Sequence, residues 1–217
     1  MSDLSLHAPI VSYPRAEELA NTITHGLGAL ASVFASVLLV RAAIPMGGLA
    51  IAAYSVFGAA LILLFSASAI YHGSSAWPEL REKLRYLDHS SIYVLIAGTY
   101  TAYCLTVLRG PLGWAIFAAV WILALGGIAL KLFFLGRFRI LSTVGYVVMG
   151  WIIMLAFGTL KARLAPEALW LLVGGGVAYT VGSIFYAAKR LPWSHPIFHV
   201  FVLAGAACHV LSVLQIR

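Results

Sequence analysis

The chain has 217 residues, of which 62% are hydrophobic and only 10% are charged, and its mean hydropathy is +0.98. Soluble domains carry about 25% charged residues, so this composition excludes an ordinary soluble protein and indicates an integral membrane protein with one domain. The net charge of +7 does not indicate a nucleic-acid partner, because the basic residues lie in short loops, where they act as topology signals and lipid contacts.

Uncharged apolar segments recur along the chain after a polar start. Residues 1–20 lack the basic start and apolar core of a signal peptide. We expect them to form a short cytoplasmic N-terminal segment ahead of a membrane domain over residues 21–217. A spanning helix needs about 20 mostly apolar residues, so we predict an all-α bundle of seven transmembrane helices. The predicted helices cover residues 22–43, 49–72, 88–108, 112–133, 140–160, 167–188 and 195–215.

The basic residues of the loops predict the orientation in the membrane. One side holds the N-terminal tail and the second, fourth and sixth loops, with Arg15, Arg81, Lys83, Arg85, Lys131, Arg137, Arg139, Lys189 and Arg190. The other side holds Arg41, Arg109, Lys161, Arg163 and Arg217. Because cytoplasmic loops carry the excess of Lys and Arg, we expect a cytoplasmic N-terminus and an external C-terminus in the cell (plasma or inner) membrane.

Polar side chains collect at the predicted cytoplasmic ends of three helices. His72 ends the second helix, one turn after Ser68, and Asp88 is expected to open the third helix after a loop of about fifteen residues. His195 and His199 open the last helix at a spacing that places two imidazoles on one face, where they can hold one metal ion. Since polar groups in membrane helices are costly and usually face the bundle interior, we expect all five to share a partner.

The chemistry of this set favours zinc over a site for a hard cation. Three neutral imidazoles leave a fourth tetrahedral position open, as in catalytic zinc sites. We therefore predict Zn²⁺ on His72, His195 and His199, with Asp88 accepting a proton from the activated water and Ser68 bonding to the same oxygen. Iron, cobalt and copper also suit these ligands. Each feature alone has a simpler interpretation, such as an interfacial histidine or a helix start, and only their convergence favours a site.

A further polar set lies at the start of the first predicted helix. Glu18, Asn21 and His25 share one helix face. This face is either a capped, amphipathic helix start or a layer of side chains that supports the metal site from below. His209 lies on the last helix about 15 Å deeper than His199, too far to bind the same metal, and we expect it to form a buried hydrogen bond.

Taken together, these motifs resemble the hemolysin III branch of the progestin and adipoQ receptor (PAQR) family. The resemblance extends from about Arg15 to Arg217 and is carried by Glu18-x-x-Asn21-x-x-Thr24-His25, Ser68-x-x-x-His72, Asp88, and His195-x-x-x-His199 with His209. It implies a seven-helix bundle with zinc on the three histidines near the cytoplasmic face, and Asp88 and Ser68 near the metal-bound water. The adiponectin receptors of this family are similar to ceramidases, and bacterial members are linked to membrane homeostasis. With only about twenty residues before the first predicted helix, we expect no soluble receptor domain for a protein hormone.

Two classes of function follow as expectations. The first is a zinc-dependent intramembrane hydrolase of a lipid amide or ester, similar to a ceramidase, which Asp88 and the open metal position favour. The alternative is a non-enzymatic lipid sensor, receptor-like protein or cytolysin, in which a structural zinc ties the second and seventh helices together. A fourth protein ligand would favour this alternative. In both cases the partners are membrane lipids. A transporter is a weaker third function, because no predicted helix looks broken at mid-membrane.

Overall fold

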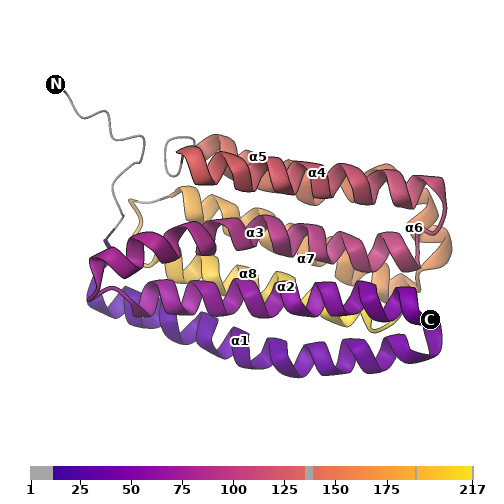
Figure 1. Cartoon of the computed structure of the whole chain (residues 1–217), viewed down its shortest axis with the longest axis horizontal. Helices are drawn as coiled ribbons and strands as arrows, with labels where there is room; N and C mark the ends of the chain where they lie inside the picture. The colour runs from indigo at the N-terminus through magenta and orange to yellow at the C-terminus, as the bar shows by residue number, and fades with distance from the viewer. Residues whose placement is uncertain (1–11, 135–138, 189, 217) are drawn as a thin grey trace.

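The computed structural model of the protein describes residues 12–134, 139–188 and 190–216. Over these residues the chain forms an all-α bundle of seven long helical spans (Figure 1), as predicted. The helices are α1 (Arg15–Ala43), α2 (Gly48–Gly73), α3 (Pro78–Thr106), α4 (Pro111–Phe134), α5 (Arg139–Trp151), α6 (Phe157–Arg163), α7 (Pro166–Ala187) and α8 (Ser194–Val213), with short 3₁₀ helices η1 (Ile44–Met46) and η2 (Ile152–Ala156).

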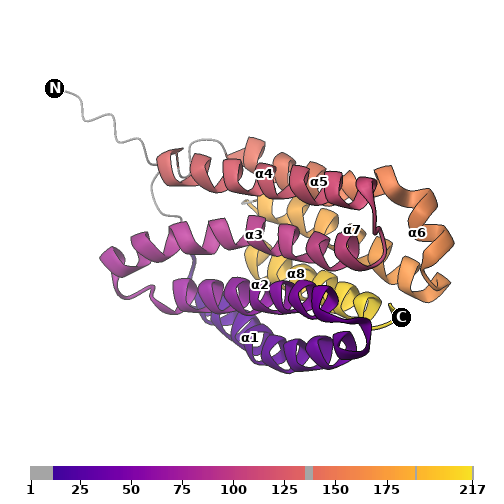
Figure 2. The same ribbon diagram turned by 45° about the vertical axis from the view of Figure 1, so that its right-hand side comes forward.

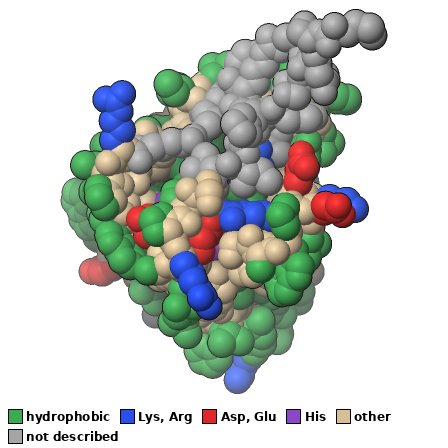
Figure 3. Space-filling model, turned by 90° about the vertical axis from the view of Figure 1, so that its left-hand side faces the viewer, with side chains coloured by type: hydrophobic (Ala, Val, Ile, Leu, Met, Phe, Trp, Pro, Cys, Tyr) green, Lys and Arg blue, Asp and Glu red, His purple; other side chains and the backbone are tan. Residues whose placement is uncertain are grey.

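Six of the spans are long and apolar enough to cross a membrane: α1 with η1, α2, α4, the span from α5 to α6, α7 and α8. The exception is α3, whose first turns are charged and whose second half is rich in tyrosine and threonine, most of it buried. Large hydrophobic side chains are exposed along the outer helix faces, and in Figure 3 they surround an end face where acidic and basic side chains gather. An apolar girdle around a polar end is what a lipid environment requires. The protein is therefore a multi-span membrane protein.

Proline and glycine set the connections between the helices. Proline occupies the first position of α3, α4 and α7, where its missing N–H costs nothing. Residues 45–48 connect the first two predicted helices, and Gly47 there has φ 95°, a conformation that only glycine adopts easily. Gly110, between α3 and α4, has φ 113° for the same reason.

Two helices begin earlier than predicted. α1 starts at Arg15 rather than near residue 22, and α3 starts at Pro78 rather than at Asp88. Asp88 therefore lies inside α3, and the expected loop of about fifteen residues shrinks to residues 74–77. The charged first turns of α3 resemble a loop in composition, but their side chains divide into a buried face with Arg81 and Arg85 and an exposed face with Glu82. Amphipathicity, rather than hydropathy, makes this segment a helix.

The fifth span is broken at mid-length, which the sequence did not predict. Between α5 and α6 the chain forms the 3₁₀ helix η2. The buried hydroxyl of Tyr100 on α3 donates to the carbonyls of Met149 and Gly150, at 2.8 and 2.9 Å, and accepts the N–H of Ile153 at 2.7 Å. One side chain on a neighbouring helix thus satisfies the backbone groups that the break would leave unpaired in an apolar surrounding.

The helices form a closed ring around an internal space. α1 packs on α2, α2 on α3, α5 on α3 and α7, α7 on α8, and α8 on α1, while α4 packs on the outside of α3. Figures 1 and 2 show α1 and α2 on one side, α4 and α5 on the other, and α3, α7 and α8 between them. The starts of α1, α3 and α8 and the end of α2 meet at one end of the bundle. Of the basic residues that predicted the orientation, Arg137, Lys189 and Arg217 lie outside the described residues.

Candidate metal centre

Three histidines from α2 and α8 converge at this end of the bundle. Nε2 of His195 lies 3.2 Å from Nε2 of His72 and 3.2 Å from Nε2 of His199. His72 and His199 are each only 1% exposed, and His195 is partly buried. The ligand atoms of the three residues all lie within 4.8 Å of one another, so the cluster could hold one metal ion.

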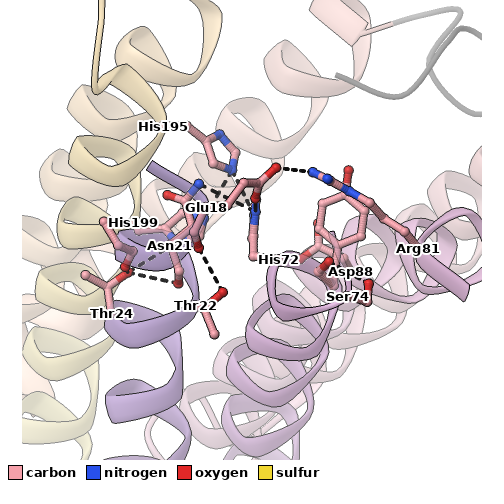
Figure 4. Close-up of polar contacts among 12 residues, drawn as sticks. Glu18, Asn21, Thr22, Thr24, His72, Ser74, Arg81, Asp88, His195 and His199 are labelled. Carbon is pink, nitrogen blue, oxygen red and sulfur yellow. Dashed lines mark hydrogen bonds and ion pairs between the residues drawn. The ribbon is translucent and has the colours of Figure 1, made fainter. Parts of the chain in front are cut away.

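The ring of His72 is oriented by a buried acid. Its Nδ1 lies 2.7 Å from Oε2 of Glu18 on α1, and the other oxygen of that carboxylate pairs with the guanidinium of Arg81 on α3 (Figure 4). Because the carboxylate accepts the Nδ1 proton, Nε2 keeps its lone pair and faces the other two histidines. Carboxylate–histidine pairs of this kind orient metal ligands and raise their basicity.

The ring of His199 is oriented by a hydroxyl on α1. Thr24 Oγ1 donates to the carbonyl of Ala20 at 2.7 Å, which leaves its lone pairs to accept from Nδ1 of His199 at 3.4 Å. This arrangement again places the ring proton on Nδ1 and the free lone pair on Nε2.

The donor set fits zinc. The Nε2 lone pairs of His72 and His199 both point at Nε2 of His195. Neutral His195 carries only one ring proton, so it can donate a hydrogen bond to at most one of them. A cation between the three nitrogens satisfies all of them. With Zn–N bonds of about 2.0–2.1 Å, tetrahedral ligand atoms lie about 3.3 Å apart, which matches the two separations of 3.2 Å. Within residues 12–134, 139–188 and 190–216, no fourth His, Cys, Asp or Glu joins this group.

Asp88 and Ser68 lie beside the histidine cluster rather than in it. Both line the same internal cavity as His195 and His199. The Asp88 carboxylate is 3.2 Å from Nδ1 of the neighbouring His89 and close enough to the Ser68 hydroxyl to interact with it. Figure 4 shows Asp88 on the Arg81 side of His72. The structure thus places an acid and a hydroxyl at the level of the cluster, although Asp88 reaches this level from the third turn of α3 and not from its first residue.

The three residues predicted near the start of the first helix all contact the cluster, in different ways. Glu18 bonds to His72, and the amide nitrogen of Asn21 lies 3.5 Å from the same Nδ1. His25 stacks on His199, with ring centroids 3.5 Å apart and planes within 7°. Both ring nitrogens of His25 are buried without a hydrogen-bond partner among the described residues, and the ring lines the cavity.

Three contacts at the site were not predicted from the sequence. Arg81, one of the basic residues that predict the orientation, pairs with Glu18 inside the bundle. Thr24, which belongs to the motif at the start of the first helix, bonds to His199. Tyr13 stacks on His195, with centroids 4.7 Å apart. Arg81 could have been found from the amphipathic pattern of residues 78–88, whereas no local signal marks the partners of Thr24 and Tyr13.

The cavity beside the cluster is long and mainly apolar. It has a volume of about 380 Å³ and is lined by side chains of α1, α2, α3, α5, α7 and α8. On α8 it extends from His195 to His209, a distance of roughly 20 Å along the helix axis. Its size and its few polar groups are typical of a small-molecule site. The predicted hydrogen bond of His209 is present, from Nε2 to the carbonyl of Leu172 at 3.1 Å.

Nearly the whole chain matches known proteins. The sequence model of the family described as Haemolysin-III related matches residues 13–210. The chain is 45% identical over 199 residues to Hemolysin-3 of Bacillus cereus, covering 91% of this chain and 90% of that protein. It is also 45% identical over 199 residues to a Hemolysin-3 homolog of Bacillus subtilis (strain 168), covering 91% and 93%. A human protein, Monocyte to macrophage differentiation factor, is 26% identical over 205 residues, covering 91% and 83%.

Proposed function

The chain belongs to the Haemolysin-III related family, and from this membership and its site we propose that it is a zinc-dependent intramembrane hydrolase of a lipid amide or ester. The observation that carries the proposal is that three imidazole Nε2 atoms converge at an apolar cavity that Asp88 and Ser68 also line. An open metal position, a carboxylate and a chain-sized apolar space in one place are the parts that lipid hydrolysis requires.

His72, His195 and His199 would hold a zinc ion, which would supply a Lewis acid able to activate water at neutral pH. The residues of the chain divide the remaining work. Glu18 and Thr24 hold the rings of His72 and His199 in the tautomers that bind metal. Asp88 provides the carboxylate that takes up and returns a proton, and Ser68 orients that carboxylate or the substrate. The apolar walls bind the hydrocarbon chain and exclude bulk water.

The proposal includes a location. The excess of Lys and Arg in the helix ends and loops on the side of the start of α1 supports a cytoplasmic N-terminus. The histidine cluster lies at the same end of the bundle as the start of α1, so the site would open near the cytoplasmic face of the cell membrane. A lipid substrate could then reach it from the inner leaflet.

Lipid turnover by purified protein in liposomes tests the proposal. We expect zinc-loaded wild type to release fatty acid from ceramide or from another lipid amide or ester in a broad panel, and zinc removal to abolish release. Asp88→Asn should lower the rate by about 10²–10⁴-fold while keeping the zinc content. Glu82→Gln, an exposed acid of the same helix, is the matched control and should keep full activity. If the zinc-loaded wild type turns over no lipid of the panel, the hydrolase proposal is wrong.

A second candidate is a zinc-tied membrane protein without catalysis. Two observations favour it: α2 and α8 have little direct packing with each other, so a metal ion would join them, and the Bacillus relative is named Hemolysin-3. In this case zinc removal should lower the unfolding temperature. As a cytolysin, the zinc-loaded protein should release dye from liposomes; as a lipid sensor, it should change its conformation when the lipid composition changes. Asp88→Asn should leave both properties unchanged, which separates this candidate from the hydrolase.

A further inference from the structure

We propose that the end of the cavity farthest from the histidine cluster, where His209 and Tyr179 line the wall, binds a hydroxyl group carried on a lipid chain. Two polar atoms at this end, Nδ1 of His209 and the hydroxyl of Tyr179, are buried without a hydrogen-bond partner among the residues that the structure describes. Both residues line the cavity. Buried polar atoms without a partner are rare and costly in folded proteins, and a ligand or a water normally explains them.

The ring of His209 is held rigidly, with its acceptor atom free. His209 is 8% exposed, and its Nε2 donates to the carbonyl of Leu172 at 3.1 Å. This bond fixes the proton on Nε2 and leaves a lone pair on Nδ1. The Cδ2–Nε2 edge of the ring lies against Gly175 of α7, where a Cβ atom would overlap Cδ2 and Nε2 of His209. The glycine therefore makes room for a ring that offers one acceptor.

The ring of Tyr179, which carries a hydroxyl unpartnered within the described residues, lies beside the ring of His209. Its ring meets that of His209 at 67°, with centroids 5.3 Å apart. The tyrosine ring also packs against Gly205 of α8, where a Cβ atom would be 2.8 Å from Cε1 of Tyr179. Two close glycine contacts thus fix both rings at the α7–α8 interface, with an acceptor and a donor left over on the cavity wall.

Only some ligand groups satisfy both atoms. A plain hydrocarbon chain satisfies neither, a ketone or ester carbonyl accepts only from Tyr179, and an ammonium group donates only to His209. A hydroxyl group donates to Nδ1 and accepts from the tyrosine at the same time. A water molecule can do the same, so water alone is the competing occupant.

The position along α8 sets where the hydroxyl lies on the chain. His209 is ten residues beyond His199, or about 15 Å deeper. An extended hydrocarbon chain advances about 1.25 Å per carbon, since its C–C bonds of about 1.5 Å are staggered. A polar head at the metal therefore places about the twelfth carbon beside Tyr179. Only the assignment of the head to the metal rests on the proposed function, and chain binding itself requires no hydrolysis.

Equilibrium binding to the purified full-length protein tests this site without turnover. The probes are octadecanoic acid and its 3-hydroxy and 12-hydroxy derivatives, in competition with a fluorescent fatty acid. We expect the 12-hydroxy acid to bind about tenfold more tightly than octadecanoic acid, because one satisfied buried pair is worth about that factor, and the 3-hydroxy acid to show no such gain. Equal binding of all three acids would overturn the proposal and leave water as the occupant.

Two variants and a control locate the effect. Tyr179→Phe and His209→Phe should each abolish the preference for the 12-hydroxy acid and leave the affinity for octadecanoic acid unchanged or higher. Tyr179→Phe keeps the test valid if His209→Phe does not fold, because it removes a hydroxyl with no hydrogen-bond partner among the described residues. Tyr186→Phe, on the cavity wall near His195, should keep the preference. A preference that survives Tyr179→Phe would contradict the site, whatever the outcome of the hydrolysis assay.

Discussion

The carboxylate of Glu18 on α1 and the imidazole of His72 on α2 are joined by a buried bond of 2.7 Å between Oε2 and Nδ1. This pair does more than fill the interior: it decides which nitrogen of His72 faces His195 and His199. Arg81 balances the charge of the carboxylate from α3. Three helices thus cooperate to present one lone pair to the candidate metal centre.

Glu18→Gln should weaken zinc binding about 10–100-fold. The amide removes the negative charge that faces Nδ1 of His72 and balances the charge of Arg81. Zinc affinity is measured by competition with a chromophoric chelator. Glu82→Gln on the exposed face of α3 should bind zinc like the wild type. An unchanged affinity in Glu18→Gln would show that this acid does not support the metal ligand.

Thr24→Val should also weaken zinc binding, by about tenfold. Valine has nearly the shape of threonine but cannot accept the Nδ1 proton of His199. Thr22→Val is a close control, because Thr22 is on the same helix and its hydroxyl bonds to the carbonyl of Glu18 in its own helix. Equal affinities of the two variants would mean that the hydroxyl of Thr24 does not orient His199.

Gly175→Ala should destabilise the protein by about 1–3 kcal/mol relative to Gly174→Ala. The added methyl group at residue 175 would meet the pinned ring of His209, whereas nothing lies within 4 Å of a Cβ atom at residue 174. Thermal unfolding in detergent, followed by circular dichroism, compares the two. Equal unfolding temperatures of the two variants would contradict the close contact between Gly175 of α7 and His209 of α8.

Tyr100→Phe should cost about 1–3 kcal/mol of stability, because it leaves the N–H of Ile153 and two carbonyls at the break in the fifth span without their partner. Tyr179→Phe, which removes a buried hydroxyl with no bond in the described part of the chain, should not destabilise. Urea or heat unfolding of both variants checks the difference. A Tyr100→Phe variant as stable as wild type would show that Tyr100 does not stabilise η2.

Much of the fold could be predicted because the signals are local. Uncharged segments of spanning length predict the seven helical spans, and the turn at Gly47 depends only on its own residues. The start of α3 was missed because its first turns are charged, and hydropathy does not detect an amphipathic helix that continues into a span. The break at η2 was missed because its cause, the hydroxyl of Tyr100, lies on another helix.

The histidines of the candidate site could be predicted for a similar reason. His195 and His199 are one turn apart, and the helix count brings His72 to the same end of the bundle. The contacts that orient these histidines join distant parts of the sequence. Thr24 is 175 residues from His199, and Arg81 is 63 residues from Glu18, whose carboxylate orients His72. Such pairings depend on how the helices pack against one another, and the spacing of residues along a single sequence does not reveal that packing.

The zinc content of the purified protein tests the central claim most directly. Wild type prepared with zinc and then dialysed should retain about one zinc per chain, measured by inductively coupled plasma mass spectrometry. His199→Ala should lose most of it, whereas His209→Asn, about 15 Å along the same helix, should keep it. A wild type without bound zinc, or a His199→Ala variant that retains one zinc per chain, would contradict the three-histidine metal centre.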